Sequence, residues 1–151
     1  MDEEADWTGF VPADQDMVFA EPVNAYGSQR PTNQEFSIQL KKRTKAAAIQ
    51  LINFLQVAGK NPALNVIRYQ LIKSATSVAA NYRAACRARS KKEWYAKMCI
   101  VVEECDETVF WLEILLESEI QVEKDTVRTI GKEYFTLLQI FAKARANAKT
   151  K

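Results

Sequence analysis

The 151-residue sequence contains no histidine and only four glycines. Histidine is the usual general base and a common zinc ligand, so its absence removes His-dependent catalytic triads and most catalytic metal centres. Neither a glycine-rich phosphate loop nor a Gly-x-Ser-x-Gly turn occurs. We therefore expect a protein that is not an enzyme, with no catalytic residues, no cofactor and no small-molecule substrate.

Long hydrophobic runs and paired cysteines are also missing. No apolar run approaches the roughly 18 residues of a membrane span, and the acidic start MDEEADW lacks the basic and apolar regions of a secretory signal. Cys86, Cys99 and Cys105 are odd in number and show no Cys-x-x-Cys spacing, which disfavours a disulfide framework. These absences predict a soluble, cytoplasmic protein that does not contact membranes.

The charges divide the chain into two parts. Residues 1–32 carry seven acids and one base, a net charge of −6, whereas the remaining residues carry 20 bases and 12 acids, a net charge of +8. Three of the four prolines fall in residues 1–32, where no helical or strand period is sustained. We expect residues 1–32 to form an extended or disordered tail and residues 33–151 to form one domain.

Aromatic residues interrupt the acidic tail. Trp7, Phe10 and Phe19 are interleaved with aspartates and glutamates, a composition typical of a segment that orders on a partner. They are therefore candidate partner-binding residues. Two alternatives stay open, a non-native extension and a disordered leader without a partner.

From residue 32 onward, apolar residues recur at steps of three and four in four segments, which is the period of amphipathic helices. The segments begin at about residues 34, 62, 91 and 126, and the links between them are short. The stripe of the second segment is Leu64, Ile67, Leu71, Ala75, Val78, Tyr82 and Ala85. Short links make consecutive helices antiparallel. We predict an all-α fold, an up-down-up-down antiparallel four-helix bundle with an extended N-terminal tail.

Particular residues mark the helix ends. Gly59 is placed to end the first helix in a left-handed conformation, and Asn61-Pro62 is a cap followed by a first-turn proline. The stretch SKKE fits a capping box, in which the Ser90 hydroxyl accepts from the Glu93 amide and the Glu93 carboxylate accepts from the Ser90 amide. Asp125 is the expected cap of the fourth helix.

The third segment is rich in carboxylates, which raises the possibility of a di-iron site. Such a site needs histidines beside the carboxylates, and none exists, so we expect no metal. If the second and third helices are antiparallel about a turn near residue 89, Lys73 faces Glu104, and Arg68 faces residues 107–111. These pairs predict ion pairs between the helices.

Basic residues gather in two places. One cluster surrounds the turn after the second helix, and the other lies on the first helix. Their members are Arg83, Arg87, Arg89, Lys91 and Lys92 in the first cluster, and Lys41, Lys42, Arg43 and Lys45 in the second. Such patches suit phosphate backbones, so these are the candidate nucleic-acid-binding residues. The alternative is an ordinary solvated surface, in which the arginines only complement a helix dipole.

The third segment carries nearly two apolar stripes, more than one monomeric bundle needs. The surplus is most simply buried between subunits of a homo-oligomer. The expected interface residues are Tyr95, Val102, Phe110 and Trp111.

Residues 71–117 also carry a resemblance. They read LIKSATSVAANYRAACRARSKKEW and, after Tyr95, AKMCIVVEECDETVFWLEILLE. This resembles the bacterial four helix bundle protein family, also called 23S rRNA intervening-sequence proteins, with its patterns L-x-x-S-x-T-S-V-x-A-N-Y-x-E-A-x-R-A-R-S and E-x-D-E-x-x-F-W-L-E. The likeness covers about residues 33–147, with the first and fourth helices matching mainly in pattern and length. Ala84 departs from it, standing where the family usually has glutamate.

The resemblance implies a non-enzymatic helical bundle that assembles as a homo-oligomer, typically five-membered. Family genes lie inside insertions in 23S rRNA genes, and relatives serve as accessory subunits of diversity-generating retroelements, as adaptors for a reverse transcriptase and its RNA. The first hypothesis is accordingly a scaffold or adaptor that binds RNA, or a nucleoprotein partner such as a reverse transcriptase, through its basic surface. The alternative is a protein–protein assembly module whose tail docks on a neighbouring subunit or partner, without nucleic acid.

Overall fold

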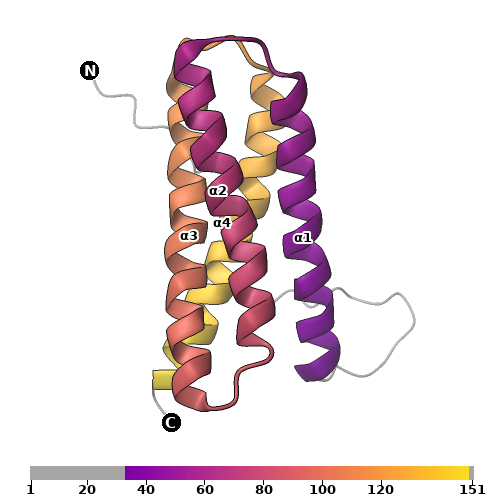
Figure 1. Cartoon of the computed structure of the whole chain (residues 1–151), viewed down its shortest axis with the longest axis vertical. Coiled ribbons are helices and arrows are strands. Elements are labelled where there is room, and N and C mark those ends of the chain that lie inside the picture. Colours follow the sequence, from indigo (N-terminus) through magenta and orange to yellow (C-terminus); the bar gives the residue numbers. More distant parts are fainter. Residues whose placement is uncertain (1–32, 150–151) are drawn as a thin grey trace, which may run out of the picture.

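The computed structural model describes residues 33–149, which form four helices (Figure 1). They are α1 (Asn33–Val57), α2 (Pro62–Ala85), α3 (Lys91–Glu117) and α4 (Lys124–Lys149). Each helix runs antiparallel to the one before it, which confirms the predicted all-α, up-down-up-down bundle. The predicted tail, residues 1–32, lies outside the described residues.

The apolar stripes of the helices meet in one core. Every residue of the predicted α2 stripe is buried, and Leu71, Ala75 and Val78 have no exposed surface. The buried residues of α4 also recur at steps of three and four: Val127, Ile130, Tyr134, Leu137 and Phe141. Helical periodicity therefore predicted which faces the bundle buries. None of the helices formed by residues 33–149 has the combined length and apolarity that crossing a bilayer requires.

A buried polar contact joins α2 to α3. The hydroxyls of Ser74 and Thr108 lie 2.8 Å apart, and both side chains are fully buried. Because an unpaired hydroxyl in a core is costly, this contact favours one register of α2 on α3.

The predicted ion pairs between α2 and α3 are wrong within residues 33–149. Lys73 is exposed, and one carboxylate oxygen of Glu104 is buried without a hydrogen-bond partner. Arg68 turns instead to the end of α1. Its guanidinium donates to the carbonyls of Leu55, Ala58 and Gly59 at 3.1–3.2 Å.

This arginine also corrects the predicted end of α1. Gly59 does not adopt the left-handed conformation. The last carbonyls of a helix need partners, and here the Arg68 side chain supplies them in place of the backbone amides of a glycine cap.

The starts of α2 and α4 are capped by side chains. The Asn61 carboxamide oxygen accepts from the amides of Ala63 and Leu64 at 2.8 and 3.2 Å, as predicted for an Asn-Pro start. At α4 the predicted cap is wrong, because the Glu123 carboxylate, not Asp125, accepts from the first amides. The hydrogen bond from the Thr126 hydroxyl is the main cause that lowers the pKa of Glu123.

The helices do not pack equally along their lengths. α1 packs along α2 but meets α4 over a shorter stretch. In Figure 1, α1 and α4 diverge toward the end of the bundle where α1 begins and α4 ends. This end also holds the turn between α2 and α3 and is called the basic end below, and the opposite end is called the far end.

Candidate nucleic-acid interface

The turn between α2 and α3 is built by local hydrogen bonds. The amides of Arg87 and Ala88 each donate to the carbonyl three residues earlier, at 3.0 Å, which ends α2. Ser90 is extended, with φ −149°, and its hydroxyl accepts from the Glu93 amide at 3.1 Å, as the capping box predicted.

The other half of the capping box differs from the prediction. The Glu93 carboxylate accepts from the amide of Arg89 at 2.9 Å, not from that of Ser90. The Arg89 Nε lies 3.3 Å from the same oxygen, so charge attraction reinforces the bond. The hydrogen bond from the Arg89 amide is the main cause that lowers the pKa of Glu93.

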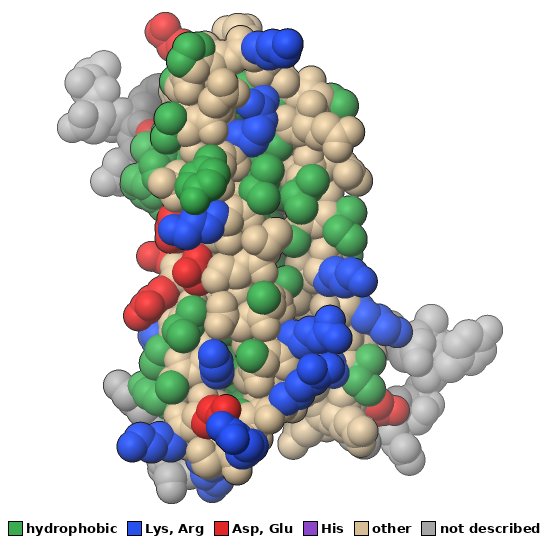
Figure 2. Space-filling view, in the orientation of Figure 1, with side chains coloured by type: hydrophobic (Ala, Val, Ile, Leu, Met, Phe, Trp, Pro, Cys, Tyr) green, Lys and Arg blue, Asp and Glu red, His purple; other side chains and the backbone are tan. Residues whose placement is uncertain are grey.

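All five residues of the predicted basic cluster lie at or near this turn and are exposed: Arg83, Arg87, Arg89, Lys91 and Lys92. Arg89 is held by Glu93, but the other four side chains make no hydrogen bond or ion pair with residues 33–149. Figure 2 shows Lys and Arg side chains gathered over the lower half of one face, with Asp and Glu side chains at the edge formed by α3. The charges of these four side chains therefore face solvent and are not neutralised by other described residues.

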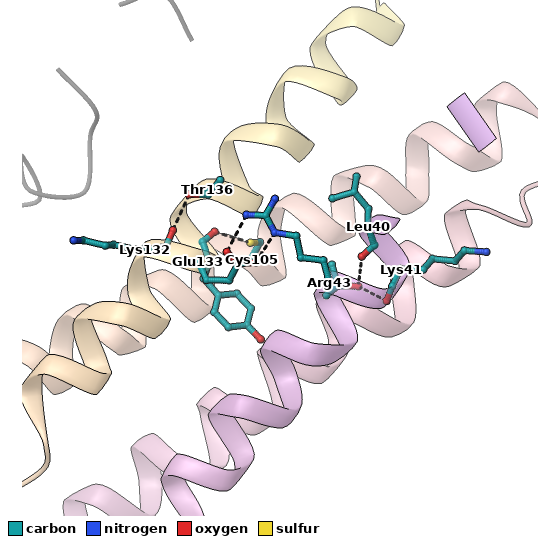
Figure 3. A network of polar contacts seen from close by, with 9 residues as sticks. Leu40, Lys41, Arg43, Cys105, Lys132, Glu133 and Thr136 are labelled. Atoms are coloured by element: carbon teal, nitrogen blue, oxygen red, sulfur yellow. Dashed lines mark hydrogen bonds and ion pairs between the residues drawn. The ribbon is translucent and has the colours of Figure 1, made fainter. Parts of the chain in front are cut away.

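The predicted cluster on α1 is divided between two uses. Arg43 reaches across to α4, where its Nε and second guanidinium nitrogen lie 2.5 and 2.9 Å from the Glu133 carboxylate oxygens (Figure 3). The hydrogen bond with Glu133 is the main cause that raises the pKa of Arg43. Arg43 thus links α1 to α4. Of the three lysines in this cluster, Lys42 and Lys45 are exposed and Lys41 is half-buried.

A cavity lies between the helix ends at the basic end, and we call it the end groove. It has a volume of about 1170 Å³ and is bordered by the start of α1, the α2–α3 turn and the end of α4. Lys41 lines it together with Lys91 and Lys92, so the structure brings a residue of the α1 cluster to the other cluster. Proximity in sequence could not show this, because about 50 residues separate them.

Two further basic residues lie at the basic end. Lys143 and Arg145 belong to the last turns of α4, and neither is in the predicted clusters. The up-down-up-down order is the sequence signal that could have found them, since it places the ends of α2 and α4 together.

The predicted interface residues have different environments. Phe110 is 49% exposed, and its ring meets that of Trp111 edge-on at 5.1 Å. Trp111 is half-buried and donates its indole N–H to Glu107 at 3.3 Å. Tyr95 is half-buried and lines the end groove, whereas Val102 belongs to the core of the bundle and offers little surface to a partner.

Trp7, Phe10 and Phe19 lie outside the described residues. Among residues 33–149, no three cysteine or carboxylate side chains gather in a way that could hold a metal ion. Burial is the main cause that raises the pKa of the Glu113 carboxyl on α3, and Glu117 adds to it.

Comparison with known structures finds the same fold elsewhere. A protein of unknown function from the S23 ribosomal protein family of Bacteroides thetaiotaomicron superposes with a TM-score of 0.65 at 23% sequence identity. The match covers 73% of this chain and 97% of the other. At that identity the likeness shows the fold alone. The sequence matches no protein-family model and no curated protein.

Proposed function

We propose that this protein is a non-enzymatic, homo-oligomeric helical scaffold that binds structured RNA through its basic end. The observation that carries the proposal is that each of the four helices carries a basic side chain in the part that lies toward the same end of the bundle. Lys41 comes from α1, Arg83 from α2, Lys92 from α3 and Lys143 from α4.

The form of the surface favours a nucleic acid over a small anion. Arg83 and Arg87 are exposed around the end of α2, and the two exposed lysines at the start of α3 border the end groove, so the charges spread over a helix end, a turn and a groove edge. Contacts of this kind neutralise several phosphates along a backbone and read its shape rather than its bases. Double-stranded RNA is recognised largely in that way.

Oligomerisation would multiply this interaction. Large apolar side chains on the far-end halves of α2 and α3 are exposed, among them Tyr69 at 67%, Val66 at 58% and Phe110 at 49%. Such side chains suit burial between copies of the chain. A ring, five-membered as the family resemblance implies, would present the basic end several times, so weak phosphate contacts would act together.

Two likenesses support this proposal. The structural neighbour is named for a ribosomal protein family, and residues 71–117 resemble a family whose relatives act as adaptors for a reverse transcriptase and its RNA. A nucleoprotein complex is accordingly the second form of partner that we propose for the basic end.

The test is the affinity for a fluorescently labelled RNA hairpin, measured by anisotropy at several salt concentrations. We expect binding whose logarithm falls steeply with the logarithm of the salt concentration, and Arg87→Glu should weaken it and lower the slope by about 1. The matched control is Lys60→Glu, an exposed base at the far end, which should change little. No binding at low salt, or equal losses in both variants, would leave the protein–protein assembly module as the better explanation.

A further inference from the structure

The end groove is an apolar feature with a basic rim. The buried rings of Tyr82 and Phe141, whose centroids lie 5.0 Å apart, are among the residues that border it. Phe36, Trp94 and Ile140 line it and remain only half-buried. Beyond the part of α1 that lines the groove, Arg43 binds Glu133 on α4.

The charged residues that line the groove all have one sign. Lys41, Lys91 and Lys92 line it, and among the described residues that border it there is no aspartate or glutamate. Apolar surface beside unopposed lysines suits a ligand that is apolar in the middle and acidic at its edges.

Residues 14–21 of the same chain have this composition. They read DQDMVFAE, in which Met17, Val18 and Phe19 form an apolar triplet with Asp14 and Asp16 before it and a glutamate after it. We propose that this segment docks in the end groove of its own bundle, with the triplet against the half-buried apolar side chains that line the groove and the carboxylates beside the lysines.

The path of the chain makes the contact accessible. Asn33 and Gln34 border the groove, so the residues that precede them start at its rim. The 11 residues 22–32 can span up to about 36 Å when extended, more than the roughly 14 Å length of the groove-lining part of α1. A tether this short gives a high effective concentration, so even a weak contact is populated.

The shape of the groove favours a segment over a folded partner. It is a concave space between helix ends, whereas two folded proteins need a broad complementary surface of about 800 Å² on each side. On the proposed function, occupancy would also place carboxylates beside three of the lysines that bind RNA, so the segment would compete with RNA. That consequence rests on the proposed function, but the docking itself does not.

The three cysteines allow a test that needs no RNA. Cys86 is exposed and borders the groove, Cys99 lies outside it, and Cys105 is buried. The full-length protein is treated with N-ethylmaleimide, and the modification of each cysteine is followed by mass spectrometry. We expect Cys86 to react at least about fivefold faster in Phe19→Asp than in the unaltered protein, with Cys99 unchanged in both.

Phe10→Asp is the matched control, because it makes the same change in the same acidic tail but outside residues 14–21. It should leave Cys86 as slow as in the unaltered protein. Equal Cys86 rates in the unaltered protein and Phe19→Asp would overturn the proposal, as would release by Phe10→Asp alone. Protection that fades on tenfold dilution would also overturn it, by assigning the groove to a second copy. Since RNA is absent, failure here leaves the proposed function untouched, and failure of RNA binding leaves this docking untouched.

Discussion

The two ends of the bundle differ in how their helices contact one another. At the far end, α1 and α3 are each joined to the following helix by a cation. Arg68 of α2 donates to the Leu55 carbonyl of α1 and to two carbonyls just past its end, and Lys124 of α4 donates to the carbonyls of Leu115 and Ser118 at 2.7 Å. At the basic end, α1 stands apart from α4 and leaves the end groove. Elements with fewer packed contacts are the ones that proteins use for binding, so stability should reside toward the far end and recognition at the basic end.

The sharpest test of this difference is truncation of core and groove residues on the same helix. Leu55→Ala, near the far end, removes a fully buried side chain and should cost about 2–5 kcal/mol of unfolding free energy. Phe36→Ala, at the groove, should cost less than half as much, because the ring is already partly exposed. Urea unfolding measures both. Equal losses would show that the basic end is packed as tightly as the rest.

The second test removes the closure of α1. Arg68→Ala deprives three backbone carbonyls of a charged donor and should cost about 1–3 kcal/mol. Lys73→Ala is the matched control, since this exposed lysine on the same helix should change stability by less than about 0.5 kcal/mol. If thermal and urea unfolding find the two variants alike, the arginine does not close the far end.

The smallest effect is expected from acid at the basic end. The folded-state pKa of Glu93 lies below its ordinary 4.5, so the stability that its carboxylate contributes is complete above that value and lost as the pH falls through the lower folded pKa. Glu93→Gln should therefore lose less stability than the unaltered protein between about pH 5 and about pH 3. The urea midpoint at each pH is the measurement.

Glu113→Gln supplies a control of opposite sign. Burial raises the pKa of Glu113, so the folded state holds this proton more tightly, and stability rises as the pH falls toward the ordinary 4.5. Replacing Glu113 removes that gain, and the variant should lose more stability in acid than the unaltered protein. Parallel pH profiles for all three proteins would contradict both assignments.

Prediction from the sequence succeeded where the cause was local. The α2 stripe and the caps Asn61 and Ser90 were predicted because periodicity and capping involve neighbouring residues. The predicted conformation at the end of α1 and the predicted partner of Lys73 were wrong, because both depend on side chains from another helix. A register rule can place Arg68 opposite α3, but it cannot show that the guanidinium finds better partners on α1.

The sequence by itself determined four amphipathic helices, their antiparallel order and a basic cluster at the turn between α2 and α3, since each follows from spacing within a few residues. Only the tertiary structure decided how α1 sits against α4. That placement engages Arg43 with Glu133, 90 residues away, and brings Lys41 to the lysines of α3. The reason is physical, because side chains that compete for contacts between helices settle the angle at which two helices pack, and periodicity along either helix does not contain that angle.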